Sequence, residues 1–597
     1  MTRPVLRSAP AVAFLLFVAA APWAARGEKL RVEVEGLGGA LSGLLENRSL
    51  RGSDVRQNVL SALTIAAAAK KEEDLTERRI RTLHARAPEE IRRALEPFGY
   101  YRPTIDATLK KEPEGRWLAT YRLDPGMAIR VESVDLKVTG EGASDWGFRV
   151  AQRRFPLREG DPLAHAAYQT GKAAFEEMAS RIGYLDGRFE TSELRVDLER
   201  YRSSIVLHYE TGPRYLFGPV TFRQEALDPD LLRGYVTWER GAPLNTDKLL
   251  ELQNALSDSP YFSRVEVVAE QEQAEGQEVP IAVNLVPAKP QRYQFGLGYG
   301  TDTGPRGSAL AEYRRLNRRG HRAEMELKLS QIEKSGTAKY LLPGPYPRTD
   351  MVTFSLGYAD IRTDTSESKA FLAGADRSQL RGLWRESLSL LYEREDFKVG
   401  VDRGVARLLV PGVSYSRVIA ENRITTRKGY RLQLKLSGAQ EGALSNATFL
   451  QAYASGKGIR PLGRRGRLIT RAETGYTETP DFRKLPPRIR FFAGGDQSVR
   501  GYGFQELGER DEEGNVIGGP TLLVGSVEYE YRFLPKWGLA TFFDAGAASD
   551  SFSGPFQKGV GLGVRWISPV GPIRLDGAYA LDDPRGFRIH VNIGPDL

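Results

Sequence analysis

From Gln291 to its end, the sequence consists of short segments in which apolar and polar residues alternate. Clear examples are MVTFSLGY (351–358), LLVGSVEYEY (522–531) and VGLGVRW (560–566). A period of two is the pattern of a strand with one apolar and one polar face, and about ten residues let a tilted strand cross a bilayer. We count sixteen segments, from YQFGLGY (293–299) to RIHVNIG (588–594). Because an even number closes an antiparallel barrel with both chain ends on one side, residues 291–597 are predicted to form a 16-stranded antiparallel transmembrane β-barrel.

The connections between these segments differ in length. Short turns at residues 317–320, 461–466 and 568–571 alternate with longer connections at residues 359–369 and 545–557. Outer-membrane barrels have short periplasmic turns and long external loops. The residues that precede the barrel are expected on the side of the short turns, so we assign them to the periplasm.

Residues 28–290 contain a unit that recurs three times. Each copy opens with a strand (30–35, 129–138 and 215–222), continues with an amphipathic helix and closes with two strands. Gly99 and Gly183 stand where the first two helices need a left-handed residue at their ends, and Pro260 takes that place in the third copy. We predict three α+β modules in series, at residues 28–125, 126–212 and 213–290.

The first 27 residues have the layout of a secretory signal. Arg3 and Arg7 precede an apolar stretch at residues 9–21, which is too short to anchor the chain in a membrane. Ala25-Arg26-Gly27 then resembles a signal-peptidase site. We predict that residues 1–27 are a removable signal peptide.

The composition argues against several classes of function. The absence of cysteine excludes disulfides, thiolate nucleophiles and Cys-ligated metals. The five histidines are scattered, and neither H-E-x-x-H nor Gly-x-Ser-x-Gly occurs. The Gly-x-Gly-x-Gly runs at 296–300 and 559–563 precede no predicted helix, so we interpret them as strand glycines. We therefore expect no enzymatic activity, no cofactor, no metal site and no nucleic-acid partner.

The connection at residues 481–520 is too long for a hairpin loop and contains V-R-G-Y at residues 499–502. This tetrapeptide resembles the sixth-loop signature of the BamA/TamA superfamily of outer-membrane insertases and translocons, whose loop folds back inside the barrel. An arginine in the lumen needs a carboxylate partner, because an unpaired buried charge is costly. Alternation points Glu528 and Asp544 inward. The predicted latch consists of Val499, Arg500, Gly501, Tyr502, Glu528 and Asp544. The alternative is an exposed loop arginine with unrelated carboxylates in the wall.

The resemblance covers nearly the whole mature chain and identifies the three modules as POTRA domains. Three modules rather than five are similar to the TamA branch of the superfamily and not to the BamA branch. The phrases FGYYRPTI (98–105), PRYLFGPVTF (213–222) and SPVGPIRLD (568–576) also resemble that branch. The final IGPDL (593–597) is similar to it as well, and it lacks the terminal Phe common in barrels.

The resemblance implies a non-enzymatic factor in the outer membrane of a Gram-negative bacterium that helps to insert autotransporters and other β-barrel clients. The implied partners are unfolded client proteins, outer-membrane lipids and a long periplasm-spanning protein, TamB. Clients would use the lateral seam between the first and last strands, where we single out Gly296, Gly298, Ile593 and Gly594. The alternatives are a two-partner secretion pore, a general outer-membrane insertase, part of a phospholipid transport bridge and a passive porin.

Charge is distributed unevenly over the predicted connections. The periplasmic turns are basic at residues 314–322, 427–428 and 464–467, whereas external connections are acidic at residues 360–367, 393–396, 509–513 and 582–583. We predict a basic periplasmic rim, centred on Arg318, Arg319, Arg464 and Arg465, that attracts anionic headgroups or an acidic partner. The alternative is that these residues only keep the turns soluble.

Overall fold

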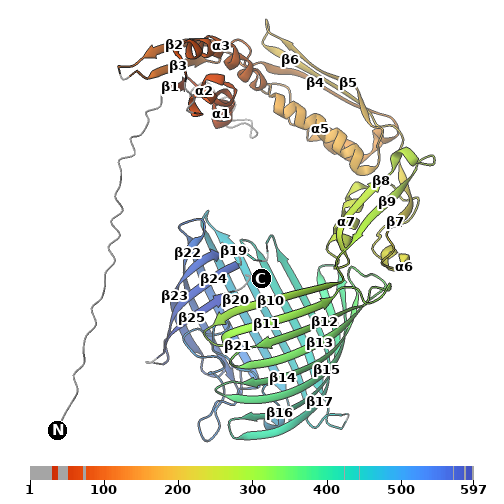
Figure 1. Ribbon diagram of the computed structural model, residues 1–597, viewed down its shortest axis with the longest axis vertical. Helices are drawn as coiled ribbons and strands as arrows, with labels where there is room; N and C mark the ends of the chain where they lie inside the picture. The colour runs from red at the N-terminus through yellow and green to blue at the C-terminus, as the bar shows by residue number, and fades with distance from the viewer. Residues whose placement is uncertain are drawn as a thin grey trace, which may run out of the picture. The chain divides into compact units, whose positions relative to one another are not determined.

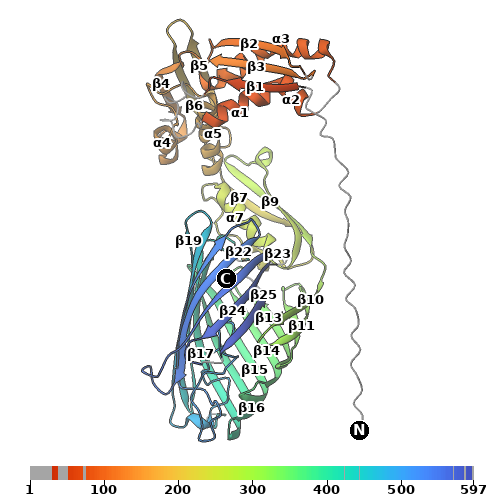
Figure 2. The ribbon, with the colours of Figure 1, turned by 90° about the vertical axis from the view of Figure 1, so that its left-hand side faces the viewer.

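The computed structural model describes residues 30–37, 52–71, 75–113, 115–422, 424–442, 444–568, 571–583 and 586–593 (Figures 1 and 2). The predicted signal peptide and Gly594 lie outside these residues. The described residues divide into two compact units, one formed mainly by those up to Phe217 and the other mainly by those from Gly218 onward. None of the helices in the described ranges is long and apolar enough to cross a membrane.

The first module packs three helices against a three-stranded sheet. Its elements are β1 (Leu30–Glu35), α1 (Gly52–Ala62), α2 (Thr64–Lys70), α3 (Glu77–Leu95), the 3-10 helix η2 (Glu96–Phe98), β2 (Thr104–Lys111) and β3 (Trp117–Asp124). The sheet order is β1-β3-β2, with β1 parallel and β2 antiparallel to β3. Ile80 and Ile91 of α3 share one buried cluster with Tyr121 of β3. Gly99 ends η2 in the left-handed conformation, at φ 86°, as its position predicts.

The second module repeats this plan. Its elements are β4 (Arg130–Thr139), η3 (Glu141–Ser144), α4 (Trp146–Arg153), α5 (His165–Ile182), β5 (Arg188–Asp197) and β6 (Arg202–Glu210). The sheet order is β4-β6-β5. Phe148 of α4 and Phe175 of α5 flank Tyr209, with ring centroids 5.8 and 6.0 Å from its ring. Gly183 ends α5 at φ 94°, again as predicted.

The third module has the same sheet order, β7-β9-β8. Its elements are β7 (Leu216–Arg223), α6 (Pro229–Arg233), α7 (Thr246–Ser257), η4 (Gln271–Gln273), β8 (Phe262–Ala269) and β9 (Glu278–Pro287). In all three sheets the last strand lies between the first and the second, so the repeat read from the sequence is also a repeat of fold.

The third module contacts the turn between β11 and β12, residues 314–321. Tyr261 donates a hydrogen bond from Oη to the carbonyl of Gly320 at 2.6 Å, and Arg318 Nε lies 3.2 Å from Asp228 Oδ1. Gly320 has φ 75°, and a Cβ there would lie 2.5 Å from Leu231 Cδ2. Glycine therefore allows both the turn and this close approach.

Sixteen antiparallel strands form the barrel, in sequence order from β10 to β25. The strands are β10 (Gln291–Gly300), β11 (Gly304–Tyr313), β12 (Arg322–Leu329), β13 (Glu333–Pro343), β14 (Met351–Arg362), β15 (Ser366–Arg381), β16 (Trp384–Val399), β17 (Asp402–Ala420), β18 (Gly429–Ala439), β19 (Phe449–Leu462), β20 (Gly466–Glu478), β21 (Thr521–Arg532), β22 (Trp537–Ser549), β23 (Gln557–Ser568), β24 (Gly571–Ala580) and β25 (Phe587–Ile593). The predicted fold class and strand number are confirmed. Because all neighbours are antiparallel, the turns alternate between two ends, which we call the module end, where the third module docks, and the far end.

The barrel is nearly closed. β10 and β25 lie side by side, but the sheet order contains no pairing between these two strands within the described residues. The two strands that border the seam are short, since β25 has 7 described residues and β10 has 10, whereas β17 has 19. We refer to the gap between β10 and β25 as the seam.

Two predicted external connections are wrong. Residues 359–369 lie mostly in β14 and β15, with only residues 363–365 between the strands, and residues 393–396 lie inside β16. These polar segments keep the alternation, because Ser366 and Ser368 are buried on the inner face while Glu367 is exposed. A polar segment stays in strand form when neighbours on both sides supply its backbone hydrogen bonds, as β14 and β16 do here.

Candidate functional site

The loop between β20 and β21, residues 479–520, lies against the inner wall of the barrel. Its 3-10 helix η5 (Phe482–Lys484) follows β20, and Val499 and Tyr502 join a buried cluster with Leu522 and Val524 of β21. Gly501 has φ 101°, and a Cβ there would lie 2.9 Å from the backbone nitrogen of Ala580. The V-R-G-Y segment therefore packs through Val499 and Tyr502, while Gly501 permits the close approach to β24.

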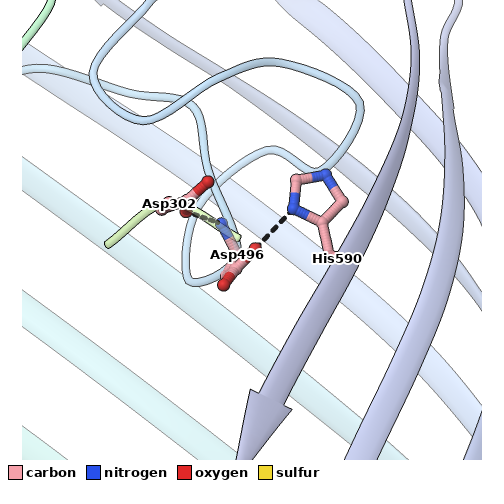
Figure 3. Close-up of side chains that lie close together, drawn as sticks. All are labelled: Asp302, Asp496 and His590. Atoms are coloured by element: carbon pink, nitrogen blue, oxygen red, sulfur yellow. Dashed lines mark hydrogen bonds and ion pairs between the residues drawn. The ribbon is translucent and has the colours of Figure 1, made fainter. Parts of the chain in front are cut away.

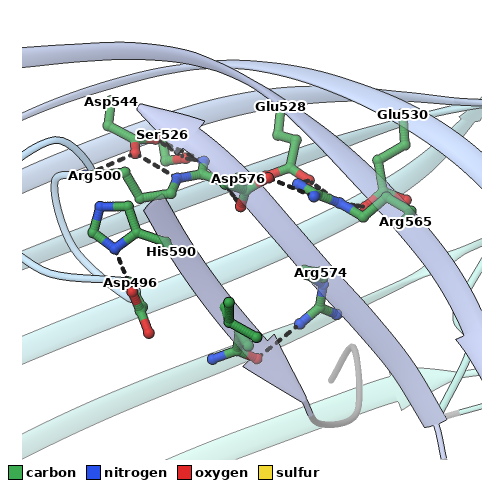
Figure 4. Close-up of polar contacts among 12 residues, drawn as sticks. Asp496, Arg500, Ser526, Glu528, Glu530, Asp544, Arg565, Arg574, Asp576 and His590 are labelled. Carbon is green, nitrogen blue, oxygen red and sulfur yellow. Dashed lines mark hydrogen bonds and ion pairs between the residues drawn. The ribbon is translucent and has the colours of Figure 1, made fainter. Parts of the chain in front are cut away.

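Arg500 binds three carboxylates from three strands (Figure 4). Its Nε lies 2.7 Å from Asp544 Oδ2, and its Nη1 lies 2.8 Å from Glu528 Oε2 and 3.1 Å from Asp576 Oδ2. The guanidinium also stacks on Phe542, whose ring centroid is 3.4 Å from the Arg500 Cζ. The structure thus brings together Arg500, Glu528 and Asp544, the charged members of the predicted latch, and adds Asp576, which the sequence analysis missed.

A second arginine, Arg565 of β23, extends this network (Figure 4). Its Nη2 lies 2.7 Å from Glu528 Oε1 and its Nε lies 2.9 Å from Glu530 Oε1, and it also pairs with Asp576. The side chains of both arginines are 6% exposed. Removing two guanidinium groups from water is costly, so each must be matched by well-placed carboxylates, and the four acidic residues of the wall provide them. Arg565 and Glu530 were missed as well.

Another buried arginine anchors the outer part of the loop. Arg490 donates to the carbonyls of Leu485 at 2.8 Å and Arg483 at 2.9 Å, and it lies 3.2 Å from Asp402 Oδ2 at the start of β17. The loop is therefore fixed at two points, by Arg490 near the far end and by Arg500 deeper in the lumen. No motif in the sequence marked Arg490.

The same loop reaches both sides of the seam (Figure 3). The backbone N–H of Asp496 donates to Asp302 Oδ2, in the turn between β10 and β11, at 2.8 Å. The Asp496 carboxylate bonds to Nδ1 of His590 on β25, and the N–H of Gly501 donates to His590 Nε2 at 3.1 Å. Burial raises the pKa of Asp302. The hydrogen bond from the Asp496 N–H opposes this rise, and the negative charge of the Asp496 carboxylate adds to it. We call Asp302, Asp496 and His590 the seam cluster.

Two carboxylates and an imidazole are also potential metal ligands, and the ligand atoms of the seam cluster lie within 4.8 Å of one another. However, Nε2 of His590 accepts the N–H of Gly501, so the ring proton belongs on Nδ1, from which it is donated to Asp496. A metal ion on Nδ1 would move that proton to Nε2, where it would face the N–H of Gly501. The hydrogen bonds of this cluster therefore occupy both ring nitrogens of His590 and leave neither of them for a metal ion.

The remaining predicted seam residues lie where the strands of the seam meet. Gly296 and Gly298 of β10 line a cavity of about 440 Å³ together with Arg306 and Ile593. Two side chains cross the seam, since Arg306 Nη2 donates to the carbonyl of Ile593 at 3.4 Å and the N–H of Val591 donates to Thr301 Oγ1 at 2.8 Å. Thus side chains, and not a strand ladder, hold the described part of the seam together.

The four residues predicted for the basic rim all lie at the module end. Arg319, Arg464 and Arg465 are exposed. Arg318 pairs with Asp228 of the third module, so it takes part in docking that module. The prediction treated all four arginines as equivalent, and the structure separates Arg318 from the others.

Two segments of the chain match known domains. Residues 411–596 match the Omp85 superfamily domain, and residues 49–125 match a POTRA domain, TamA domain 1. The outer membrane protein assembly factor BamA of Nitratidesulfovibrio vulgaris is 36% identical over 126 residues, which are 20% of this chain and 15% of that protein. The chloroplastic outer envelope protein 80 of Arabidopsis thaliana is 36% identical over 123 residues, 19% of this chain and 15% of that protein. The chain thus aligns with only a small part of either relative.

The fold also occurs in a solved structure. The crystal structure of BamA from Haemophilus ducreyi lacking POTRA domains 1–3 has a TM-score of 0.65 and 15% identity, and it covers 78% of this chain and 99% of its own. At this identity the likeness shows a common fold, namely POTRA modules followed by a 16-stranded barrel.

Proposed function

We propose that this chain is an outer-membrane protein assembly or secretion factor of the Omp85 kind that passes or inserts client proteins through the seam between β10 and β25. The observation that carries the proposal is the seam itself, where two edge strands meet without a strand ladder among their described residues. The Omp85 match and the BamA relative support it. In this proposal the barrel lies in the outer membrane of a Gram-negative cell and the modules lie in the periplasm.

Edge strands supply the proposed chemistry. The unpaired side of β10 presents backbone N–H and C=O groups, and such an edge can template a strand from another chain. Gly296 and Gly298 leave two positions on the inner face of β10 without a side chain, and the described part of β25 has 7 residues for pairing. A client strand could therefore pair with β10 in place of β25 at little cost in broken hydrogen bonds.

The lumenal loop would act as the latch of this seam. Arg500 fixes the loop to β21, β22 and β24, which lie on the β25 side, whereas Asp496 contacts Asp302 on the β10 side. Movement of β10 away from β25 must break the contact at Asp302 while the contacts of Arg500 can persist. The proposed roles are anchoring for Arg500 and closure for the seam cluster.

The finer assignment is to the TamA type, with autotransporters and other β-barrels as clients and a TamB-like periplasm-spanning protein as partner. Three modules and the match of residues 49–125 to a TamA POTRA domain support this assignment. The edge strands of the module sheets are suitable places for such a partner or client to add a strand.

A reversible lock tests the proposed function. The chain has no cysteine, so Thr301→Cys with Val591→Cys would create the only possible disulfide, at a place where the two residues already share a hydrogen bond. We expect the oxidised protein to lose client insertion and the reduced protein to recover it. The matched control is Phe295→Cys with Ala309→Cys, which lie opposite each other on β10 and β11 and whose disulfide leaves the seam free. Equal client insertion by the locked and reduced forms of the seam variant would refute the proposal.

A further inference from the structure

The outer face of the barrel carries an arginine between two aromatic rings. Arg417 lies on β17 near the module end, three residues before the strand ends at Ala420. Its Cζ lies 5.9 Å from the ring centroid of Trp384 on β16 and 5.5 Å from that of Tyr430 on β18. Both distances are within the range of cation–π attraction, so the two rings hold the guanidinium in place.

The strand pattern places this group on the membrane-facing wall. Tyr415 and Ile419, the neighbours of Arg417 on the same face of β17, are exposed, and so is Leu432, its partner on β18. Trp and Tyr gather where a bilayer meets water, which agrees with a position beside the strand ends. Arg417 therefore lies at headgroup depth and not in the hydrocarbon layer.

Arg417 has no anionic partner within the described part of the chain. Its Nε is buried and makes no hydrogen bond, and no described carboxylate lies within ion-pair distance of it. The neighbouring Glu386 is already bound, by Arg381 Nη2 at 3.2 Å and by the Tyr415 hydroxyl at 2.8 Å. A held guanidinium without a partner, next to a bilayer, has the chemistry of a phosphate receptor, because arginine binds phosphate oxygens through paired N–H donors.

An apolar groove of about 450 Å³ lies further along the same outer face, between Tyr415 and Phe552 of the far-end turn that joins β22 to β23. Tyr415, two residues along β17, lines it together with Leu434 and Leu436 of β18 and Tyr476 of β20. Ala452, Ala454 and Gly475 make the groove hollow, because their side chains are too small to fill the space between the larger residues. The groove runs along the outer wall and suits an acyl chain.

We propose that Arg417, Trp384 and Tyr430 form a binding site for an anionic glycerophospholipid of the leaflet that faces the modules. The phosphate accepts hydrogen bonds from Arg417, and an acyl chain lies in the groove beside Tyr415. The nearby turn at residues 421–428 contains Arg427 and Lys428, whose charges favour a headgroup with net negative charge. This proposal uses the membrane position in the proposed function, but not the opening of the seam.

Native mass spectrometry of the full chain in detergent tests the site. We expect phosphatidylglycerol to remain bound and Arg417→Gln to lower its affinity about five-fold, the effect of about 1 kcal/mol for one basic residue at a membrane surface. Arg417→Lys should bind with intermediate affinity, because it keeps the charge but not the planar group between the rings. The matched control is Lys398→Gln, an exposed cation on the outer face of β16 at the far end, which should leave binding unchanged.

Binding measurements with other ligands test whether the site recognises an anionic lipid. Inorganic phosphate at the same concentration should not displace the lipid, and phosphatidylcholine should bind more weakly than phosphatidylglycerol. Equal affinity of wild type and Arg417→Gln, or an equal loss in Lys398→Gln, would overturn the proposal. Retention of heat-modifiable migration checks that each variant is folded. Client insertion in the seam-lock experiment does not depend on this site, so the two proposals can fail separately.

Discussion

The partners of Arg500 show which site residues can be predicted from the alternation of apolar and polar residues along the strands. Glu528 and Asp544 follow from the inward phase of β21 and β22, and the structure places both carboxylates within 3 Å of the guanidinium. The same phase also points Glu530 inward, but it gives no reason to prefer Glu530 over other polar positions of the wall. Asp576 and Arg565 could not be found, because their role depends on how β23 and β24 close round the loop. The sequence contains no sign of that closure.

Replacing Arg500 by Ala should loosen the loop. It leaves Glu528, Asp544 and Asp576 close together without Arg500, and removing one partner of a buried charge network costs about 3–5 kcal/mol. We expect faster proteolysis of residues 479–520 and reduced client insertion, while heat-modifiable migration of the barrel persists. Arg510→Ala is the control, because Arg510 lies in the same loop and its exposed side chain donates to the carbonyl of Gly514 at 2.7 Å. Loop proteolysis and client insertion at wild-type level in Arg500→Ala would argue against the latch.

At the scale of elements, the seam differs from the rest of the barrel. β14 to β17 have between 12 and 19 residues, whereas β10 to β12 and β25 have 10 or fewer. The number of strands could be predicted because each alternates, and their lengths could not. Polar residues such as Asp364 form the turn between β14 and β15, but the polar residues on either side of that turn belong to the strands. Polarity therefore does not show where a strand ends. The extension of β14 to β17 is decided by pairing with neighbours, which is a property of the sheet.

Replacing Asp302 by Asn should strengthen the closed seam at neutral pH. The amide oxygen can still accept the N–H of Asp496, but the repulsion between the two carboxylates disappears. Burial raises the pKa of Asp302, so its contribution to stability is full below the ordinary Asp value of about 4 and is lost as the pH rises through the raised value. The unfolding temperature of wild type should therefore fall between about pH 4 and neutral pH by more than that of Asp302→Asn.

Two further variants, Asp302→Ala and Asp228→Asn, serve as controls for the pH profile of Asp302→Asn. Asp302→Ala removes the charge and the acceptor together, so it should lower the unfolding temperature at both pH values. Asp228→Asn removes the partly buried carboxylate that pairs with Arg318 at the module end, and it should not change the pH dependence of the barrel in the same way. Identical pH profiles for wild type and Asp302→Asn would mean that the charge of Asp302 does not affect closure.

For the whole molecule, the domain order could be predicted because three repeated modules and a run of alternating segments are both patterns of sequence. The contacts that join the third module to the barrel could not, since Arg318 and Asp228 are 90 residues apart and neither belongs to a motif. The seam cluster was missed for the same reason, because its three residues come from the first turn, the lumenal loop and the last strand. Long-range contacts of this kind depend on the closed barrel.

The two ends of the barrel also carry opposite charge, which is a property of the molecule as a whole. Turns at the module end contain Arg319, Arg427, Arg464 and Arg465, whereas the far end has Asp302, Asp364, Glu441 and Asp582 in its turns. Exposed leucines lie in or beside the turns of this end, namely Leu316, Leu383, Leu462 and Leu534, and the far end exposes Leu444 and Leu581 in the same way. Apolar side chains next to cations are typical of a lipid interface, where one group enters the acyl region and the other meets headgroups. Solubility of the turns would require only the charges.

Replacing Arg319, Arg464 and Arg465 together by Gln should therefore weaken the binding of the purified chain to liposomes that contain phosphatidylglycerol. Arg318 is left unchanged because it pairs with Asp228. At about 1 kcal/mol per charge the loss should reach about 3 kcal/mol at low salt and shrink as ionic strength rises, because salt screens exposed charges. Lys398, Arg403 and Arg407, which are exposed towards the far end, give a control when all three are replaced by Gln. If the rim variant and the control bind equally well at low salt, the arginines serve only to keep the turns in water. If liposomes without anionic lipid show the same loss, the rim recognises the membrane surface through something other than its charge.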